Sequence, residues 1–284
     1  MIELTYILAF SIIFLSYFLL KSPGNYPTFH LLSWLNFLLF LIFLMVSYNL
    51  ISNIVWKSET SIAEELKYGI ETKNNQIKHE ELPIQNEVIP IDAPTLSQLP
   101  ELPRGCEVTA LAMLLNYAGV KVDKMTLAKQ VKKDPTPFEV KNGKIYFGHP
   151  NKGFVGDMFS RENPGYGVYH KPIRALAQLY LSSKIIDLTG EPFEVIQQHL
   201  SKGTPVWVIT NTTYQKLPQT AFIEWHTSEG PINITMREHS VLITGYDEHS
   251  IYFNDPLSGK KKKTPKEDFI EAWEQMGKQA ITYK

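Results

Sequence analysis

The chain has 284 residues, with 28 Lys and Arg against 29 Asp and Glu, and a net charge of −1. This balance excludes the broad basic surface typical of nucleic-acid-binding proteins, so we expect no nucleic-acid partner. Its single cysteine, Cys106, excludes an intramolecular disulfide and a zinc site built from several cysteines.

The N-terminal part of the sequence contains two long apolar runs, residues 4–20 and 29–56, separated by the polar stretch 21–28. The first is near the minimum length for crossing a bilayer and the second exceeds it. No small-residue cleavage site follows the first run, which argues against a removed signal peptide. The pattern predicts a transmembrane helical hairpin in residues 1–56, with spans at about 4–20 and 31–55.

Charged residues near the two predicted spans indicate how the chain is oriented in the membrane. Lys21 in the connection favours a cytoplasmic connection with both termini outside, whereas Lys57 and Lys67 argue the other way. We expect a multi-pass protein of the cell membrane with its C-terminal domain on the extracellular side. Residues 57–87 are polar and mixed in charge, and we interpret them as a tether whose first part is a short helix.

Residues 88–284 have the length and composition of one α+β domain. Asn142-Gly143 predicts a hairpin within 138–148, and the Lys260–Lys263 run indicates a solvated turn. Thr264 and Glu267 predict a helix capped at Thr264. Apolar spacing predicts the remaining elements, with helices at 106–119, 126–131, 171–181 and 192–200 and strands at 204–210, 232–236, 240–246 and 251–254.

Cys106 begins the predicted helix after an extended, proline-containing approach. A cysteine in the first turn faces unpaired N–H groups and the positive end of the helix dipole, which lower the pKa of a thiol. A lone cysteine is also often a small buried apolar residue, so the position alone leaves both interpretations open.

His239 is the histidine best placed to act as a base for this thiol. It begins an apolar strand that a short turn connects to a second strand ending at Asp255. In such a hairpin the two outer ends approach each other, so a carboxylate could orient the imidazole. A plain turn at Asp255-Pro256 is the alternative.

Three separated motifs resemble papain-like cysteine peptidases of family thirty-nine. They are Gln98 with Gly105–Thr109, the Gly153–Asp157 and Gly165–Val168 parts of the glycine- and aromatic-rich loop, and Glu238–Val241 with Asn254–Pro256. The best-known members of this family trim double-glycine leaders from bacteriocins. The resemblance is closest to the stand-alone, exported branch and covers residues 88–284, without the predicted hairpin or tether.

The resemblance implies a papain-like fold, in which the cysteine helix packs against an antiparallel sheet, and a peptide or protein substrate. It implies that Cys106 is the nucleophile, His239 the general base, Asp255 the orienting residue and Gln98 an oxyanion donor, without a metal or cofactor. The other residues of the shared motifs are expected to contact substrate, namely Gly105, Glu107, Phe154, Gly156, Asp157, Gly165, Tyr166 and Gly167.

The sequence therefore predicts a membrane-anchored cysteine peptidase. Acyl or peptidyl transfer through the same thioester remains an alternative, because the two reactions differ only in the acceptor. A third interpretation is a non-catalytic membrane module that binds a peptide on residues 154–169. The sequence does not indicate an oligomeric state.

Overall fold

The computed structural model describes residues 87–284, together with 13, 17, 34, 37–38 and 40–49, which are helical. Two compact units divide the chain, Met1–Glu81 and Leu82–Lys284. Most of the predicted hairpin and nearly all of the predicted tether at 57–87 lie outside the described residues. Within the described residues, none of the helices combines the length and apolar character needed to cross a membrane.

The larger unit is built on a six-stranded sheet in which every neighbouring pair is antiparallel. This confirms the antiparallel sheet implied by the sequence. In spatial order the strands are β11 (Lys260–Pro265), β10 (Ser250–Asp255), β9 (Glu238–Tyr246), β6 (Val206–Asn211), β12 (Ala280–Tyr283) and β5 (Ile185–Asp187).

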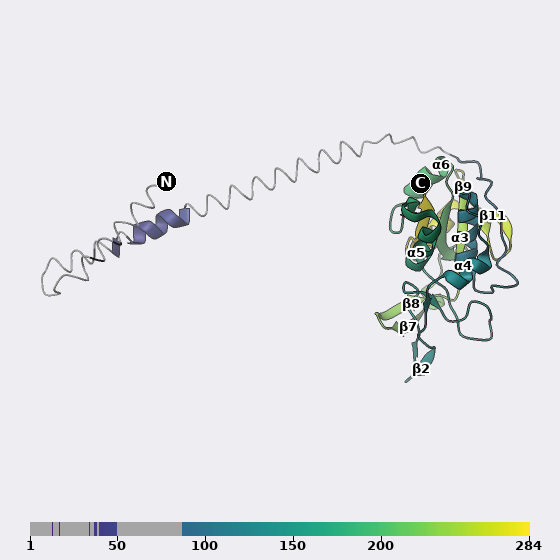
Figure 1. Cartoon of the computed structure of the whole chain (residues 1–284), viewed down its shortest axis with the longest axis horizontal. Helices are drawn as coiled ribbons and strands as arrows, with labels where there is room; N and C mark the ends of the chain where they lie inside the picture. The colour runs from purple at the N-terminus through teal and green to yellow at the C-terminus, as the bar shows by residue number, and fades with distance from the viewer. Residues whose placement is uncertain (1–12, 14–16, 18–33, 35–36, 39, 50–86) are drawn as a thin grey trace. The chain divides into compact units, whose positions relative to one another are not determined.

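Helices cover both faces of this sheet, because alternate strand residues point to opposite sides. Trp207 and Ile209 pack in a core with α3 (Cys106–Tyr117), α4 (Lys124–Gln130) and α5 (His170–Leu181). Val206 and Val208 pack in a second core with α6 (Phe193–Ser201) and α7 (Lys266–Gln275). The result is a three-layer arrangement, with α3 in contact with the two central strands β6 and β9 (Figure 1).

A smaller sheet, in the order β2-β3-β7-β8, lies at one end of this unit, away from α6 (Figure 1). Asn142 and Gly143 both have positive φ angles, 51° and 72°, so the predicted β2–β3 hairpin turn is confirmed. The strands of this smaller sheet are β2 (Glu139–Lys141), β3 (Lys144–Tyr146), β7 (Ile223–Thr227) and β8 (Gly230–Ile234). A separate two-stranded sheet pairs β1 (Lys133–Asp134) with β4 (Phe154–Val155).

Most predicted helices and strands are present within a few residues of their expected bounds. The prediction for Lys260–Lys263 was wrong, because these residues form most of the edge strand β11 rather than a turn. An exposed row of lysines suits an edge strand, since it discourages pairing with another chain. The predicted cap at Thr264 was also wrong, because β11 continues to Pro265, which is the N-cap of α7.

Candidate active site

Cys106 is the first residue of α3, as the sequence predicts. Gly105 precedes it because a Cβ at this position would lie only 2.5 Å from the Leu102 Cβ. Nearly the whole helix is buried, from Cys106 to Leu115, which fixes its first turn firmly against the sheet. As the first helical residue, Cys106 has a backbone N–H without an intrahelical acceptor, and such a group can receive an oxyanion.

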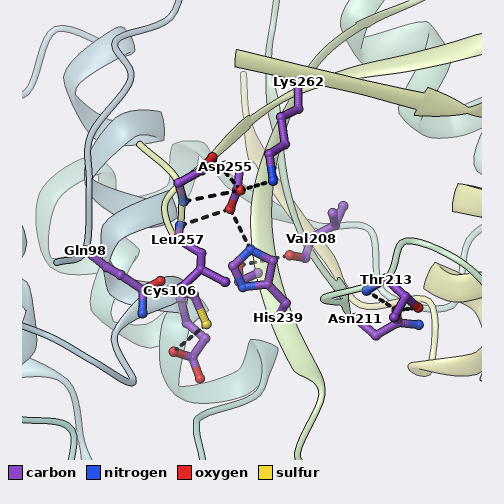
Figure 2. A network of polar contacts seen from close by, with 12 residues as sticks. Gln98, Cys106, Val208, Asn211, Thr213, His239, Asp255, Leu257 and Lys262 are labelled. Carbon is purple, nitrogen blue, oxygen red and sulfur yellow. Dashed lines mark hydrogen bonds and ion pairs between the residues drawn. The ribbon is translucent and has the colours of Figure 1, made fainter. Parts of the chain in front are cut away.

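His239 and Asp255 come together at the outer ends of β9 and β10. His239 Nε2 lies 2.7 Å from Asp255 Oδ1, and both side chains are almost fully buried. Figure 2 shows the imidazole between the Asp255 carboxylate and the Cys106 sulfur, with its other ring nitrogen turned away from the carboxylate. Because a carboxylate only accepts, Nε2 carries the proton and Nδ1 is free to act as a base toward sulfur.

Further donors hold the Asp255 carboxylate. The Leu257 N–H donates to Oδ1 at 2.9 Å, and the Ser258 hydroxyl and Lys262 Nζ each lie 2.7 Å from Oδ2. Burial alone would raise the pKa of Asp255, but the bonds from His239, Lys262 and Ser258 outweigh it and hold the pKa well below its usual range. Asp255 is therefore ionised throughout the neutral pH range.

Gln98 lies beside Cys106 in the wall of the same pocket. The Gln98 backbone N–H donates to Pro256 O at 2.8 Å, which ties this segment to the loop after Asp255. Its Nε2 donates to Leu102 O and Pro103 O, both at 3.1 Å, so both amide hydrogens are engaged. An oxyanion role for Gln98 therefore requires it to exchange one of these bonds.

Two buried carboxyl groups adjoin the thiol. Cys106 Sγ lies 3.4 Å from Glu107 Oε2, and the ligand atoms of Cys106, Glu107 and Glu238 all lie within 4.8 Å of one another. Burial, followed by the charges of Glu107 and Glu238, raises the pKa of Cys106 well above its ordinary value, against a backbone hydrogen bond at Ser240. The expectation of a lowered thiol pKa was wrong, because burial and the two neighbouring carboxyl groups outweigh the helix dipole.

The same environment shifts the carboxyl groups. Burial raises the pKa of Glu107 to about 7, although hydrogen bonds from the backbone and from Cys106 oppose the shift. Burial and the charge of Glu107 raise the pKa of Glu238 well above its ordinary value. Tyr166 and Tyr169, whose hydroxyl groups lie 3.0 Å apart, also have raised pKa values, chiefly through burial.

A pocket of about 240 Å³ opens at the thiol. Arg104, on its wall, donates from its guanidinium to the carbonyl oxygens of Asp157 and Ser160, which fixes the loop beside the cysteine. The lining residues come from both sides of the α3–β9 contact and are Gln98, Pro103, Arg104, Cys106, Arg161, Tyr166, Thr212, Met236, Glu238, His239 and Leu257.

Of the eight residues expected to contact substrate, Tyr166 lines this pocket. Phe154 is completely buried in the core, so its side chain does not face the pocket. Gly156 and Gly165 form an isolated β-bridge, where a Cβ on either glycine would overlap backbone atoms of the opposite strand. These three residues shape the loop and do not line this pocket, and contact with a substrate remains a prediction for them.

The other four surround the same region without lining the pocket. Gly105 and Glu107 lie at the buried start of α3, and Gly167 packs against Glu107, where a Cβ would overlap Glu107 Oε1. Asp157 accepts hydrogen bonds from Phe159 and Asn163, which stabilises its own loop.

Several site residues could not be selected from sequence patterns. Lys262 belongs to a lysine run, and a contact with Asp255 becomes visible only once β10 and β11 pair. Glu238 precedes His239 and belongs to the Glu238–Val241 motif, but nothing in the sequence places it near Glu107. Cys106, Glu107 and Glu238 lie close enough together to hold a metal ion, but Glu107 Oε1 already accepts the Val168 N–H, and we assign no metal.

Comparisons with known proteins identify the family of the chain. Residues 90–281 match the family described as Peptidase C39 like. The chain is 47% identical over 194 residues to YvpB of Bacillus subtilis (strain 168), described as uncharacterized, covering 68% of this chain and 74% of that protein. A crystal structure from Bacillus anthracis, provisionally described as a C39-like peptidase, is 47% identical with a TM-score of 0.65, covering 70% of this chain and 97% of that one.

Proposed function

The chain belongs to the Peptidase C39 like family and has its mixed α/β fold, and from this premise we propose that it is a cysteine peptidase using Cys106, His239 and Asp255. The observation that carries the proposal is the 2.7 Å contact between Asp255 and His239, which lines the same pocket as Cys106. A thiol, an imidazole and an orienting carboxylate are the three groups that thiol-based acyl transfer requires.

The proposed reaction begins with transfer of the Cys106 proton to His239 Nδ1. The thiolate attacks the peptide carbonyl carbon, and the C–N bond breaks as the imidazolium gives its proton to the leaving amine. Water then attacks the thioester with His239 as base, which releases the acid and regenerates the thiol. Asp255 remains ionised throughout and stabilises the imidazolium, which its low pKa permits.

The backbone N–H of Cys106 supports the developing oxyanion in this scheme, since no intrahelical acceptor competes for it. Gln98 would add a second donor by releasing one of its bonds to the carbonyls of Leu102 and Pro103. We therefore include Gln98 in the proposed site as the residue that must move to take part.

We further propose that the apolar runs at 4–20 and 29–56 anchor the peptidase in the cell membrane, with the domain on the extracellular side. The support is their length, their lack of charge and Lys21 in the connection. The proposed substrate is a peptide or protein reached from that side, which fits the stand-alone, exported branch of the family. Processing of double-glycine leaders is one specificity to include in a substrate screen.

The test is cleavage of a peptide library by the full chain, compared with Cys106→Ala and His239→Ala variants of unchanged melting temperature. We expect both variants to lose cleavage by at least about 10²-fold. Cleavage in H₂¹⁸O should place one labelled oxygen in the new carboxylate if water is the acceptor, whereas an added amine would be incorporated by a transferase. Cleavage retained in Cys106→Ala would overturn the proposal.

A further inference from the structure

We propose that Glu107 is a further catalytic residue, which in its protonated form donates a hydrogen bond from Oε2 to the Cys106 thiolate. The proposal rests on the function proposed above, because it concerns the same nucleophile. Because the Cys106 sulfur is buried, water cannot stabilise a negative charge on it, and the proposal gives this role to the Glu107 carboxyl group. It also makes the reactivity of the thiolate depend on one carboxyl proton.

The geometry fixes which oxygen of Glu107 can carry that proton. Oε1 accepts the backbone N–H of Val168 at 2.6 Å, so Oε1 acts as an acceptor. Oε2 lies 3.4 Å from Cys106 Sγ, so a proton on Oε2 would be within hydrogen-bond reach of the sulfur. In the neutral thiol the sulfur can donate to Oε2, but a thiolate has no proton, so the carboxyl group must then be the donor.

The surroundings of Glu107 hold it in place and favour a neutral carboxyl group. Glu107 is fully buried, and Gly167 leaves no space between its own backbone and the carboxyl oxygens of Glu107 and Glu238. The Trp207 indole N–H donates to the Glu107 backbone oxygen at 3.0 Å, which locks this turn of α3 onto β6. Glu238 Oε1 is buried and finds no hydrogen-bond partner among the described residues, which is costly for an ionised carboxylate.

Titratable and charged groups face Glu107 from every element packed against it. Cys106 and Glu238 lie closest, and Tyr166 and Tyr169 interact electrostatically with Glu107 from the loop before α5. His239, Arg104 and Arg161 line the pocket at the adjoining Cys106. Both tyrosines remain neutral because their pKa values are raised, and burial and the charge of Glu107 also raise the pKa of Glu238. Burial raises the pKa of Glu107 to about 7, so its carboxyl group changes protonation near neutral pH.

The proton balance is simple. The thiol proton moves to His239 Nδ1, and the Glu107 proton stays on Oε2 while it bonds to the thiolate, so no other covalent bond breaks. When Glu107 loses its proton, the same oxygen becomes a negative charge beside the sulfur and disfavours the thiolate. Thiolate reactivity should therefore decline as the pH rises through the pKa of Glu107, unlike that of an isolated thiol.

The test is the rate of alkylation of the full chain by iodoacetamide between about pH 5.5 and 8.5. The readout is specific, because Cys106 is the single cysteine of the sequence. In Glu107→Gln, the amide oxygen can still accept from Val168 and the amide N–H can donate to sulfur at every pH. We expect this variant to match the wild type within a few-fold near pH 6 and to react about tenfold faster near pH 8, one unit above the pKa of about 7.

Two other outcomes would each overturn the proposal. A Glu107→Gln variant that behaves like the wild type at every pH would show that Glu107 only anchors Val168, since glutamine preserves that bond. A variant that reacts more slowly at every pH would show that the carboxylate form is the useful one. Glu194→Gln is the matched control, because Glu194 is an exposed glutamate that is likewise the second residue of its helix, α6, and its profile should equal the wild type.

A measurement on the unmodified chain guards against a variant that does not fold. The infrared band of protonated carboxyl groups should lose intensity between about pH 6 and 8, and alkylation of Cys106 should shift it. A band that is constant over this range would contradict the proposal. Because alkylation and infrared spectra need no substrate, they report on Glu107 even if the chain cleaves no peptide, so the two proposals can fail separately.

Discussion

The imidazole of His239 and the carboxylate of Asp255 lie 2.7 Å apart although 16 residues separate them along the chain. The contact forms because β9 and β10 are antiparallel neighbours that carry the two residues at the same end of the sheet. A register shift near Tyr252 and Phe253 adds a bulge to this pair, and such bulges redirect side chains at strand ends. The base and its orienting group are thus products of one hairpin.

Asp255→Asn should lower kcat/KM by about 10²-fold or more, because an amide cannot stabilise the imidazolium as a carboxylate does. Steady-state kinetics on a peptide found in the library screen would measure this loss. Asp92→Asn is the control, since Asp92 forms a 2.7 Å ion pair with Lys261 but is 95% exposed and lies outside the pocket wall. Equal activity of Asp255→Asn and the wild type would remove Asp255 from the mechanism.

Lys262→Met should reduce kcat by roughly tenfold, because Lys262 contributes one of the bonds that keep Asp255 ionised. The pH–stability profile at acid pH should change as well, because the loss of this bond lets the pKa of Asp255 rise toward its usual value. Lys261→Met is the neighbouring control on β11, and its profile should be unchanged because Lys261 pairs with Asp92 instead. Identical profiles for the two variants would contradict a role for Lys262.

Gln98→Ala should lower kcat with little change in KM if Gln98 serves the oxyanion, and losses of about 10²-fold are typical for such donors. The same substitution also removes two buried hydrogen bonds, so a lower melting temperature is expected as well. Gln197→Ala controls for that stability effect, because Gln197 is similarly buried, at 7% exposed, but lies in α6. A kcat unchanged in Gln98→Ala would exclude the oxyanion role.

We expect the buried carboxyl groups of Glu107 and Asp255 to change the free energy of unfolding with pH in opposite directions. The pKa of Glu107 is raised by burial, so its contribution is complete below the unfolded value of about 4.3 and is lost as the pH rises toward about 7. The pKa of Asp255 is lowered, so its contribution is present above about 3.9 and is lost as the pH falls further.

Melting temperatures of wild-type and Glu107→Gln chains should therefore diverge between about pH 4.5 and 7, with the wild type losing stability relative to the variant. A constant difference across this range would show that Glu107 does not change its protonation state on folding. Asp255→Asn should instead lose its difference from the wild type only below about pH 4.

The parts of the site that were predicted from sequence are those that depend on local patterns. Cys106 at a helix start follows from apolar spacing after Gly105, and the His239–Asp255 approach follows from two apolar runs joined by a short turn. Both are confirmed. Long-range contacts could not be predicted in this way. The Lys262 contact requires the pairing of β10 with β11, and a run of exposed lysines has the composition of a turn.

The protonation of the thiol was the largest error, and its cause is packing. The helix-start position of Cys106 is visible in the sequence, whereas its burial and the approach of Glu238 from β9 depend on how α3 packs on the sheet. The short strands β5 and β12 were also missed, because three or four residues show too little alternation to identify. The predicted membrane hairpin remains a prediction.

The most direct test of a Cys106 nucleophile is to trap its thioester. We would mix the full chain with a cleaved peptide, quench in acid within the first turnover, and measure the mass of the fragment that contains Cys106. We expect an added mass equal to the N-terminal acyl part of the peptide, which disappears in Cys106→Ala and after hydroxylamine treatment. Peptide cleavage without any adduct, and at the wild-type rate in Cys106→Ala, would contradict it.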